Sequence, residues 1–482
     1  MKNNTPTTLG AIQIKTNKFL IRQTELSLAQ NVSSDILGSW KTRLGHTQTG
    51  NTLQSGKDIL GLFGDLNTNG KHLAVVNNSG DTNSVLKYLN GATWTNITGA
   101  TTLPANAEVN FTSFLDTTYI VGKNSDNSYL TTATLTGITH GTESSFPKAA
   151  DIKVYFDQLY LFDCEVGGVR YGSRVYRSSI PTYSGGWVIS FDTDTDFIQL
   201  NTDDGDYLTG GARSYGNLLA FKNYSVWGID SNGNKFPLDG VGCTSPKSIV
   251  EDDLKDVYYH HFSSKHKGVY KWDGSRSQKV SRPVEPFIEG SSGTGVVGGI
   301  YNDHILEFIG DVTLNEDIAE YYGLPTSFSN VLLDYSTQDE TWVVHTLPTE
   351  ITRIAPNGDN LYFGDNTGKI FRWNLGTADD TTPIEAIVCT HNYYGQTQEE
   401  FNLRKTFNEI IINMHKQTLA KAFYSVDNVE WIPLGQLKGK VNVFSISAKG
   451  YGIKTKVSSN SGTFIYEGNE ITYTLEQPLK KK

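Results

Sequence analysis

Short runs of alternating hydrophobic and polar residues, each ended by turn residues, fill the chain from about residue 58 to 375. Typical runs are KHLAVVNN (71–78), TTYIVG (117–122), NLLAFK (217–222) and NLYFGD (360–365). Because β-branched and aromatic side chains recur here between Gly, Asn, Asp and Ser, the pattern predicts short strands joined by hairpins. One segment, 314–322 (LNEDIAEYY), is typical of a short helix, with Asn315 as its cap and acids in its first turn.

A loose internal repeat runs through the same region. A strand ends in an aromatic residue, a tight turn follows, and the next strand starts near a Trp or Gly, as in Tyr88 to Trp94, Tyr270 to Gly274, Tyr335 to Trp342 and Tyr362 to Gly368. Asn-Gly and Asp-Gly pairs supply the positive φ angles of tight hairpins. Hairpin repeats of roughly 40 to 60 residues predict an all-β fold, a β-propeller of about five to seven blades.

The pattern changes at a polar stretch, GTADDTTPIEA (376–386), after which the strands lengthen. Alternation in FNEIIINM and YGIKTKVSS predicts a β-sandwich. Since 482 residues exceed one compact domain, we divide the chain into an N-terminal arm (1–45), a propeller (46–380) and a C-terminal sandwich with a basic tail (381–482). Within the arm, KFLIRQTELSL alternates enough to join a sheet.

Charge and cysteine content narrow the classes of function. The formal net charge of −10 disfavours unspecific attraction to nucleic acid or anionic membranes. No apolar stretch approaches the roughly 20 residues of a membrane span, and the first residues lack the apolar core of a signal peptide. We therefore expect a soluble protein made in the cytoplasm. The distant cysteines Cys164, Cys243 and Cys389 are expected to be reduced, buried thiols.

The densest acidic cluster lies in DTDTDFIQLNTDDGDYLTGG and contains Asp192, Asp194, Asp196, Asp203, Asp204 and Asp206. Oxygen ligands at alternating spacing can bind calcium, but the Gly and terminal Glu of an EF-hand loop are missing. A solvated turn with capping Asp side chains is the favoured interpretation. The adjacent His260 and His261 point to opposite faces of a strand, one inward and one outward, and cannot share one metal ion.

Signatures of catalysis are weak. A carboxylate pair for glycoside hydrolysis can be neither located nor excluded. The segment Ser425 to Trp431 is close to the Ser-x-Asp-x-Gly-x-x-Trp turn of sialidase propellers, but it is one residue short and lacks the Gly. That turn is a folding element in which Asp accepts backbone N–H groups. With no GxSxG, HExxH, Walker or Rossmann motif, we expect no enzyme, no catalytic residues, no cofactor and no metal site.

Four further segments carry a family resemblance: Leu218 to Ile229, Gly242 to Ser248 (GCTSPKS), Gly268 to Gly274 (GVYKWDG) and Lys279 to Phe287. They resemble the β-propeller structural proteins of tailed bacteriophages, including the tail nozzle (hub) proteins of short-tailed phages. The segment SLAQNVSSDILGSWKTRLG (27–45) resembles the family's opening segment, which typically ends in Arg-Pro-Gly, although Leu44 replaces the Pro here. The stretches YSVDNVEWIPLGQL and GYGIKTKVSSNSG resemble the family's C-terminal sandwich.

The resemblance implies a virion component, assembled in the host cytoplasm, that forms a cyclic ring, usually a hexamer, around the DNA exit channel. Its implied partners are other copies of itself, adjacent tail or adaptor proteins and fibre or spike proteins, with DNA passing through unbound and no membrane insertion. Six copies would carry roughly −60 in charge, which repels DNA phosphates, so the six aspartates are candidates for the lumen or rim. Two alternatives stay open, a carbohydrate-binding or glycan-cleaving host-recognition propeller and a secreted surface-binding propeller.

Overall fold

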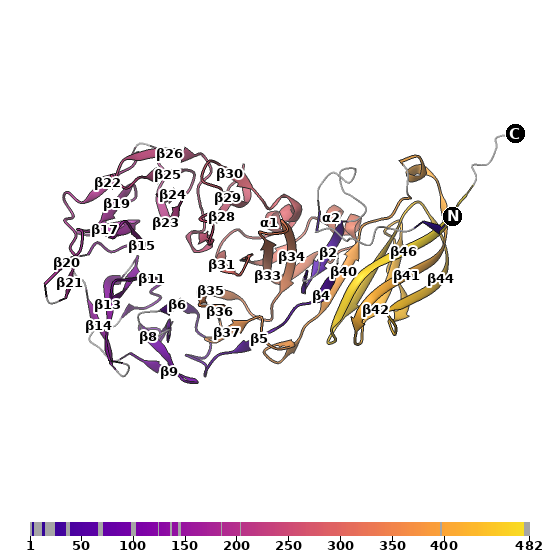
Figure 1. Ribbon diagram of the computed structural model, residues 1–482, viewed down its shortest axis with the longest axis horizontal. Helices are drawn as coiled ribbons and strands as arrows, with labels where there is room; N and C mark the ends of the chain where they lie inside the picture. The colour runs from indigo at the N-terminus through magenta and orange to yellow at the C-terminus, as the bar shows by residue number, and fades with distance from the viewer. Residues whose placement is uncertain are drawn as a thin grey trace.

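Seven sheets stand side by side around a common axis, and a β-sandwich lies against one side of the ring (Figure 1). The computed structural model describes residues 2–3, 12–14, 25–34, 39–65, 71–97, 103–123, 125–134, 137–142, 146–184, 186–202, 204–395 and 398–476. Strands carry nearly all of the regular structure, which confirms the predicted all-β propeller and sandwich. The seven sheets, here called blades 1 to 7 in chain order, agree with the predicted range of blade numbers.

Blades 1 to 4 follow one another along the chain, and each starts at the ring axis and ends at the outside. Blade 1 contains β6 (Ile59–Asp65), β7 (Lys71–Asn77), β8 (Asn83–Asn90), β9 (Thr93–Asn96) and β10 (Leu103–Pro104). Blade 2 contains β11 (Val109–Phe114), β12 (Thr117–Gly122), β13 (Ser125–Thr134) and β14 (Gly137–Thr142). Blade 3 contains β15 (Asp151–Tyr155), β16 (Gln158–Phe162), β19 (Arg174–Arg177) and β22 (Phe197–Gln199). Two small hairpins extend from it. One pairs β17 (Cys164–Val166) with β18 (Val169–Tyr171), and the other pairs β20 (Thr182–Tyr183) with β21 (Trp187–Val188). Blade 4 contains β23 (Leu208–Ser214), β24 (Asn217–Lys222), β25 (Val226–Ile229) and β26 (Lys235–Asp239).

Blades 5 to 7 complete the ring. Blade 5 contains β27 (Val250–Glu251), β28 (Val257–Phe262), β29 (Lys267–Trp272) and β30 (Ser277–Lys279). Blade 6 contains β31 (Val297–Tyr301), β32 (His304–Thr313), β33 (Ser327–Ser336) and β34 (Thr341–Thr346). Blade 7 contains β35 (Ile351–Asn357), β36 (Asn360–Asp365) and β37 (Ile370–Trp373).

Both faces of a blade are apolar because each blade packs between two others. On β24, Leu218 and Ala220 face the core shared with blade 3, while Leu219 and Phe221 face the core shared with blade 5. Alternate residues of such a strand therefore point to two buried faces, and not to one buried and one solvent-exposed face. This arrangement also explains why the prediction of one outward histidine on β28 is wrong. His260 and His261 are both buried, at 0% and 2% exposure.

The ring is closed by a strand from the start of the chain. β5 (His46–Gln48) pairs antiparallel with β37, so that blade 7 combines strands from before and after the other six blades. The polar stretch after β37 forms a hairpin, β38 (Ala378–Asp379) with β39 (Thr382–Pro383), and β38 adds to the same sheet beside β5.

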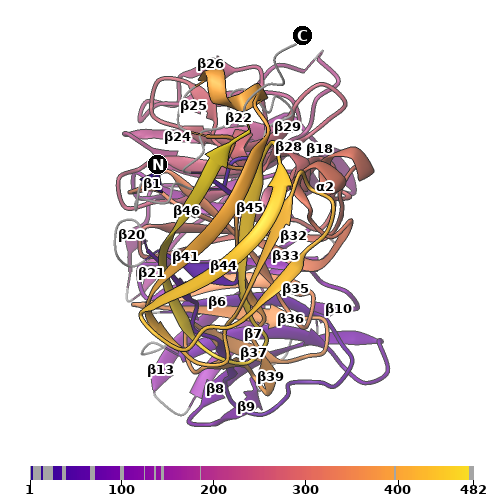
Figure 2. The ribbon, with the colours of Figure 1, turned by 90° about the vertical axis from the view of Figure 1, so that its right-hand side faces the viewer.

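The sandwich is built from both ends of the chain (Figure 2). One sheet contains β1 (Lys2–Asn3), β3 (Val32–Ser33), β4 (Trp40–Thr42), β41 (Lys405–Gln417), β44 (Val441–Gly450) and β46 (Phe464–Leu475). The other contains β2 (Leu26–Gln30), β40 (Ala386–Thr390), β42 (Lys421–Val426), β43 (Ile432–Gln436) and β45 (Ile453–Ser459). The residues 26–28 of KFLIRQTELSL therefore do join a sheet, whereas 18–24 and the basic tail at 480–482 lie outside the described residues.

The second sandwich sheet continues directly into the propeller. β2 pairs in parallel with β34 of blade 6 and antiparallel with β40, which creates one nine-stranded sheet from β31 to β43. One apolar core follows this sheet, and it contains residues of blade 5, blade 6 and the sandwich, among them Tyr258, Trp342 and Ile453. Propeller and sandwich therefore share backbone hydrogen bonds and a hydrophobic core.

Helices are few and short. α2 (Glu316–Tyr322) confirms the predicted helix, because Asn315 caps it by accepting from the Asp317 N–H at 2.9 Å. α1 (Glu285–Glu289) and the 3-10 turns η2 (Pro246–Ser248), η3 (Arg282–Val284) and η4 (Gln398–Asn402) are too short to produce a helical period in the sequence. Within the described residues, no helix is long and apolar enough to cross a membrane.

Two local predictions are also confirmed. Cys164, Cys243 and Cys389 are free and buried, and burial raises the pKa of each thiol. The Asp427 carboxylate accepts from the backbone N–H groups of Tyr451 at 2.9 Å and Gly452 at 2.8 Å, as expected of a turn that serves folding.

A buried ion pair sits where the ring closes. The Arg43 guanidinium donates from Nη1 and Nη2 to the two Asp379 oxygens at 2.7 and 2.6 Å, and both side chains are almost completely buried. Nε of Arg43 donates to Asn31, between β2 and β3, at 3.1 Å. Burial opposes the charge on Asp379, but hydrogen bonds from His46 and Arg43 lower its pKa to about 2.

Gly45, two residues further on, has no room for a side chain. A Cβ atom there would lie 1.8 Å from the carbonyl oxygen of Ala378, a backbone atom that cannot turn away. We expect Gly45→Ala to destabilise the protein by about 1–3 kcal/mol, because the closing strand must separate from β38. Urea unfolding measures this. Gly240→Ala is the control, since open space surrounds Gly240, and equal effects of the two substitutions would contradict the expectation.

Asp379→Asn should lower the free energy of unfolding by about 3–5 kcal/mol near pH 6, because it leaves the Arg43 charge buried without its partner. The native pKa of Asp379 is below its unfolded value, so the pair stabilises the fold above about pH 4 and loses this effect as the pH falls toward about 2. The difference in the free energy of unfolding between wild type and variant should therefore become smaller from about pH 5 to about pH 2.5, as measured by urea unfolding. Lys449→Gln, which breaks the exposed Lys449–Glu476 pair, should cost less than about 1 kcal/mol.

Candidate functional site

The six candidate aspartates do not form one loop, because β22 separates them. Asp192, Asp194 and Asp196 lie in the turn before β22, the outermost strand of blade 3. Asp204 and Asp206 lie in the segment that leads from β22 to β23, the innermost strand of blade 4, and Asp203 lies outside the described residues.

The first group is held by turn hydrogen bonds. The Asp194 N–H donates to Asp192 Oδ1 at 3.0 Å, and the Asp192 N–H donates to Asp196 Oδ2 at 3.3 Å. The backbone donor of Asp194 lowers the pKa of Asp192, which is exposed. Asp192 and Asp194 thus present negative charge on the outer edge of blade 3, remote from the propeller axis.

The second group holds blade 4 together. Asp204 accepts two hydrogen bonds from Nζ of Lys222, at 2.9 and 2.8 Å, and Lys222 is fully buried. The Asp206 carboxylate accepts from the Tyr224 N–H at 3.1 Å and from the Ser225 hydroxyl at 3.0 Å. Both carboxylates therefore brace the turn between β24 and β25. Among the residues with described positions, no group of three or more His, Cys, Asp or Glu side chains could hold a metal ion.

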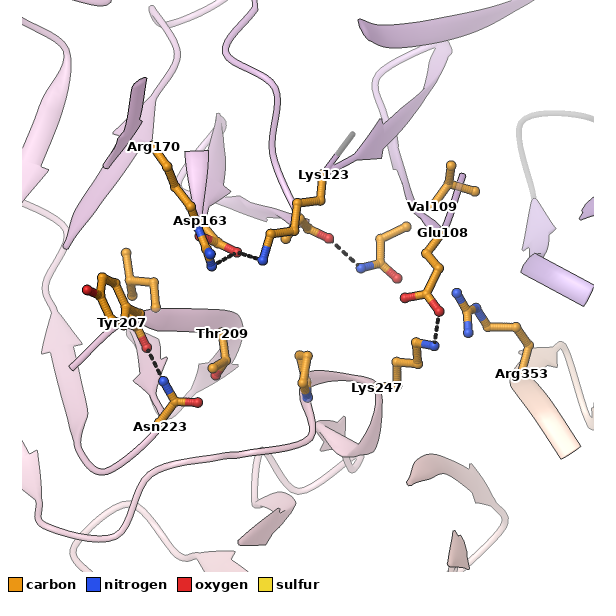
Figure 3. A pocket seen from close by; sticks show the side chains of 14 residues that line it. Glu108, Val109, Lys123, Asp163, Arg170, Tyr207, Thr209, Asn223, Lys247 and Arg353 are labelled. Carbon is orange, nitrogen blue, oxygen red and sulfur yellow. Dashed lines mark hydrogen bonds and ion pairs between the residues drawn. The ribbon is translucent and has the colours of Figure 1, made fainter. Parts of the chain in front are cut away.

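Sequence reasoning did not find a cavity in the ring. It has a volume of about 390 Å³ and lies at the axis, where the innermost strands begin (Figure 3). Blades 2, 3, 4 and 7 and the η2 turn before blade 5 contribute its walls. The lining residues are Glu108, Val109, Asn110, Lys123, Ala150, Asp163, Arg170, Tyr207, Leu208, Thr209, Asn223, Pro246, Lys247 and Arg353.

Charged side chains in this cavity form two clusters (Figure 3). In the first, Asp163 accepts from Nη2 of Arg170 at 2.6 Å and lies 3.0 Å from Nζ of Lys123. In the second, Lys247 donates to Glu108 Oε1 at 2.7 Å, and Arg353 points toward the same carboxylate. Four cationic groups thus face two carboxylates in the cavity wall, and the nearby Asp58 also acts on Lys247 and Arg353. Cations therefore outnumber carboxylates here by one, in a protein with a net charge of −10.

The pKa shifts in the second cluster follow from burial and charge. Burial opposes ionisation of Glu108, but the hydrogen bond and charge of Lys247, with the charges of Arg353 and Lys123, lower the pKa of that carboxyl. Burial and the charge of Arg353 lower the pKa of Lys247, and burial lowers the pKa of Arg353. Glu108 is therefore ionised at neutral pH and is no proton donor for general acid catalysis.

A second cavity of about 390 Å³ lies beside the β31–β32 turn of blade 6 and is lined by Ser34, Asn302, Asp303, His304, Ser336, Gln338 and Asp339. Asp334 accepts from His304 at 2.6 Å and from His345 at 3.2 Å. Burial opposes the charge on His304, but Asp334 raises its pKa. This cavity contains the carboxylates Asp303 and Asp339 beside His304.

Similarities between this chain and known proteins are weak. No family model and no curated protein matches the chain. The WD40 domain of Pan2 from Neurospora crassa is similar with a TM-score of 0.41 and 8% identity, covering 69% of this chain and 94% of that one. BamB from Moraxella catarrhalis gives a TM-score of 0.39 with 10% identity, covering 70% and 96%. A chain of the mitotic checkpoint complex gives 0.42 with 9% identity, covering 69% and 95%. Likenesses at this level carry no argument about activity, ligands or partners.

Asp206→Ala should destabilise the protein by about 1–3 kcal/mol, because it removes the acceptor of two hydrogen bonds at a buried site. Asp194→Ala is the matched control in the same acidic segment. Its carboxylate is exposed, so its loss should change stability by less than about 0.5 kcal/mol. Thermal unfolding compares the two, and a larger loss for Asp194→Ala would refute the structural role assigned to Asp206.

Proposed function

We propose that the protein is a structural component of a phage virion tail, specifically a nozzle or hub ring protein around the DNA exit channel. The observation that carries this proposal is the nine-stranded sheet that joins blade 6 to the sandwich. A ring subunit must hold its neighbours in fixed positions, and a shared sheet with a shared core suits that work better than two domains on a flexible linker.

The residues behind the phage resemblance have structural work in this fold, which supports the proposal. A Cβ atom on Gly242 would lie 2.1 Å from the Lys222 carbonyl oxygen, so only glycine fits where blade 4 passes to blade 5. Cys243 N–H donates to that same carbonyl at 2.8 Å, and Ser248 Oγ accepts from the His260 N–H at 2.8 Å. Arg43 and Gly45, which match the Arg and Gly of the family's opening segment, lie where the ring closes.

Exposed apolar side chains supply surfaces for assembly. Around the β20–β21 hairpin of blade 3, Ile180 and Tyr183 are each 69% exposed, and Trp187 and Val188 are 44% and 52% exposed. Grouped apolar side chains on a soluble protein commonly mark contacts with other proteins. Because Asp192 and Asp194 follow this hairpin closely, the proposal assigns them to the rim of the assembled ring.

Imaging of the purified protein by electron microscopy tests the proposal, alone and with the products of neighbouring genes. We expect closed rings of several copies. The double variant Tyr183→Ser/Trp187→Ser should keep its melting temperature but form at least about tenfold fewer rings. Leu254→Ser, which removes a singly exposed apolar side chain from blade 5, is the control. The proposal would be contradicted if the protein stayed monomeric under all these conditions. A gene located far from portal, adaptor and tail genes would also contradict it.

A carbohydrate-binding host-recognition propeller is the second candidate, and the axial cavity favours it. The volume of about 390 Å³ and the Tyr207 ring suit a sugar. Both cavity carboxylates are engaged in ion pairs, so binding is favoured over cleavage. Glycan-array binding without ring formation would select this candidate, and release of reducing sugar would add the cleaving activity.

A further inference from the structure

We propose that the axial cavity binds a small dianion, either a phosphate group or a dicarboxylate. The shared chemistry is two negative charges carried by oxygen atoms. This inference rests on the cavity alone and is independent of the assembly proposed above.

Within the described part of the chain, Arg353 has a hydrogen-bond donor without an acceptor. Its side chain is 8% exposed, and Nη1 donates to the Thr352 carbonyl at 2.8 Å. Among the described residues, its buried Nε has no hydrogen-bond partner. A guanidinium has five N–H donors, and burying one without acceptors is costly. The charges of Glu108 and Asp58 both act on Arg353, but neither carboxylate accepts a hydrogen bond from its Nε. An oxyanion in the cavity would supply the missing acceptors.

The two clusters face each other across the cavity (Figure 3). Lys123 and Arg170 share the single carboxylate of Asp163, and their side chains are 47% and 45% exposed. Each cluster thus contains two cations and one carboxylate. A dianion between them would contact cations from both clusters, where four cations outnumber Asp163, Glu108 and the nearby Asp58.

The volume and the lining of the axial cavity also suit a small dianion. About 390 Å³ lies at the small end of the range for ligand sites in proteins, which suits a phosphate or a small phosphorylated or dicarboxylic molecule. Asn223 donates one N–H of its amide to the Tyr207 carbonyl at 3.3 Å, and its second N–H can orient an oxyanion. The backbone of duplex DNA is too wide for this volume, so a free small molecule is the favoured occupant.

Isothermal titration calorimetry of the whole protein tests the proposal, with inorganic phosphate in one arm and malonate in the other. Ionic strength is held constant with sodium chloride, because exposed charges respond to salt. We expect one site per chain with a Kd of about 1 mM or tighter for at least one dianion. The dianion that binds with the lower Kd shows whether the cavity prefers a phosphate or a dicarboxylate.

Variants locate the site. Arg353→Gln and Lys247→Gln should each weaken binding at least about tenfold. Lys123→Gln is the safeguard if these buried substitutions unfold the protein, because Lys123 is half exposed, and it should weaken binding about threefold or more. Arg276→Gln, which removes an exposed cation from the β29–β30 turn, should leave the Kd unchanged. Absence of binding in both arms, equal effects of all variants, or binding of a duplex oligonucleotide in place of both dianions would overturn the proposal.

Discussion

The structure depends on the buried contact between Arg43 and Asp379. Arg43 reaches the nine-stranded sheet through Asn31 and blade 6 through the Thr346 carbonyl, and its guanidinium lies 5.0 Å from the Trp373 ring of blade 7. One side chain thus touches the sandwich, the sixth blade and the closing blade. A buried charge without a partner is strongly unfavourable, so this contact favours the pairing of β5 with β38, in which Asp379 lies opposite His46.

Charge is placed differently at the axis and at the edge of the propeller. The protein is acidic overall, yet its axial cavity collects Lys123, Arg170, Lys247 and Arg353 around two carboxylates. These cations come from three blades and the η2 turn before blade 5, and the blades pack on their neighbours through apolar cores. Rigid packing holds the cations close together despite their repulsion, which is the arrangement of a preformed binding site.

Local patterns predicted local structure well, while contacts distant in sequence escaped them. Alternation in NLLAFK identified a strand, and Asn315 identified a helix cap, because both depend on neighbours within a few residues. The burial of His261 was missed because no sequence signal reveals that a second blade covers that face. The cavity was missed for the same reason. Glu108 and Lys247 are 139 positions apart, and only ring closure brings them together. Lys247 does lie within the GCTSPKS turn, the one hint that the sequence contained.

The closing strand also sets the order in which the chain can fold. Arg43 and Asp379 are separated by 336 positions, so the ribosome must synthesise nearly four fifths of the chain before the two can meet. β5 has no partner strand until β37 is made, and β1 pairs with β46 near the end of the chain. Contacts of such long range slow folding and leave edges open to aggregation. A nascent chain that stalls before blade 7 would thus remain an open arc, which makes completion of translation itself the step that commits the polypeptide to its native topology.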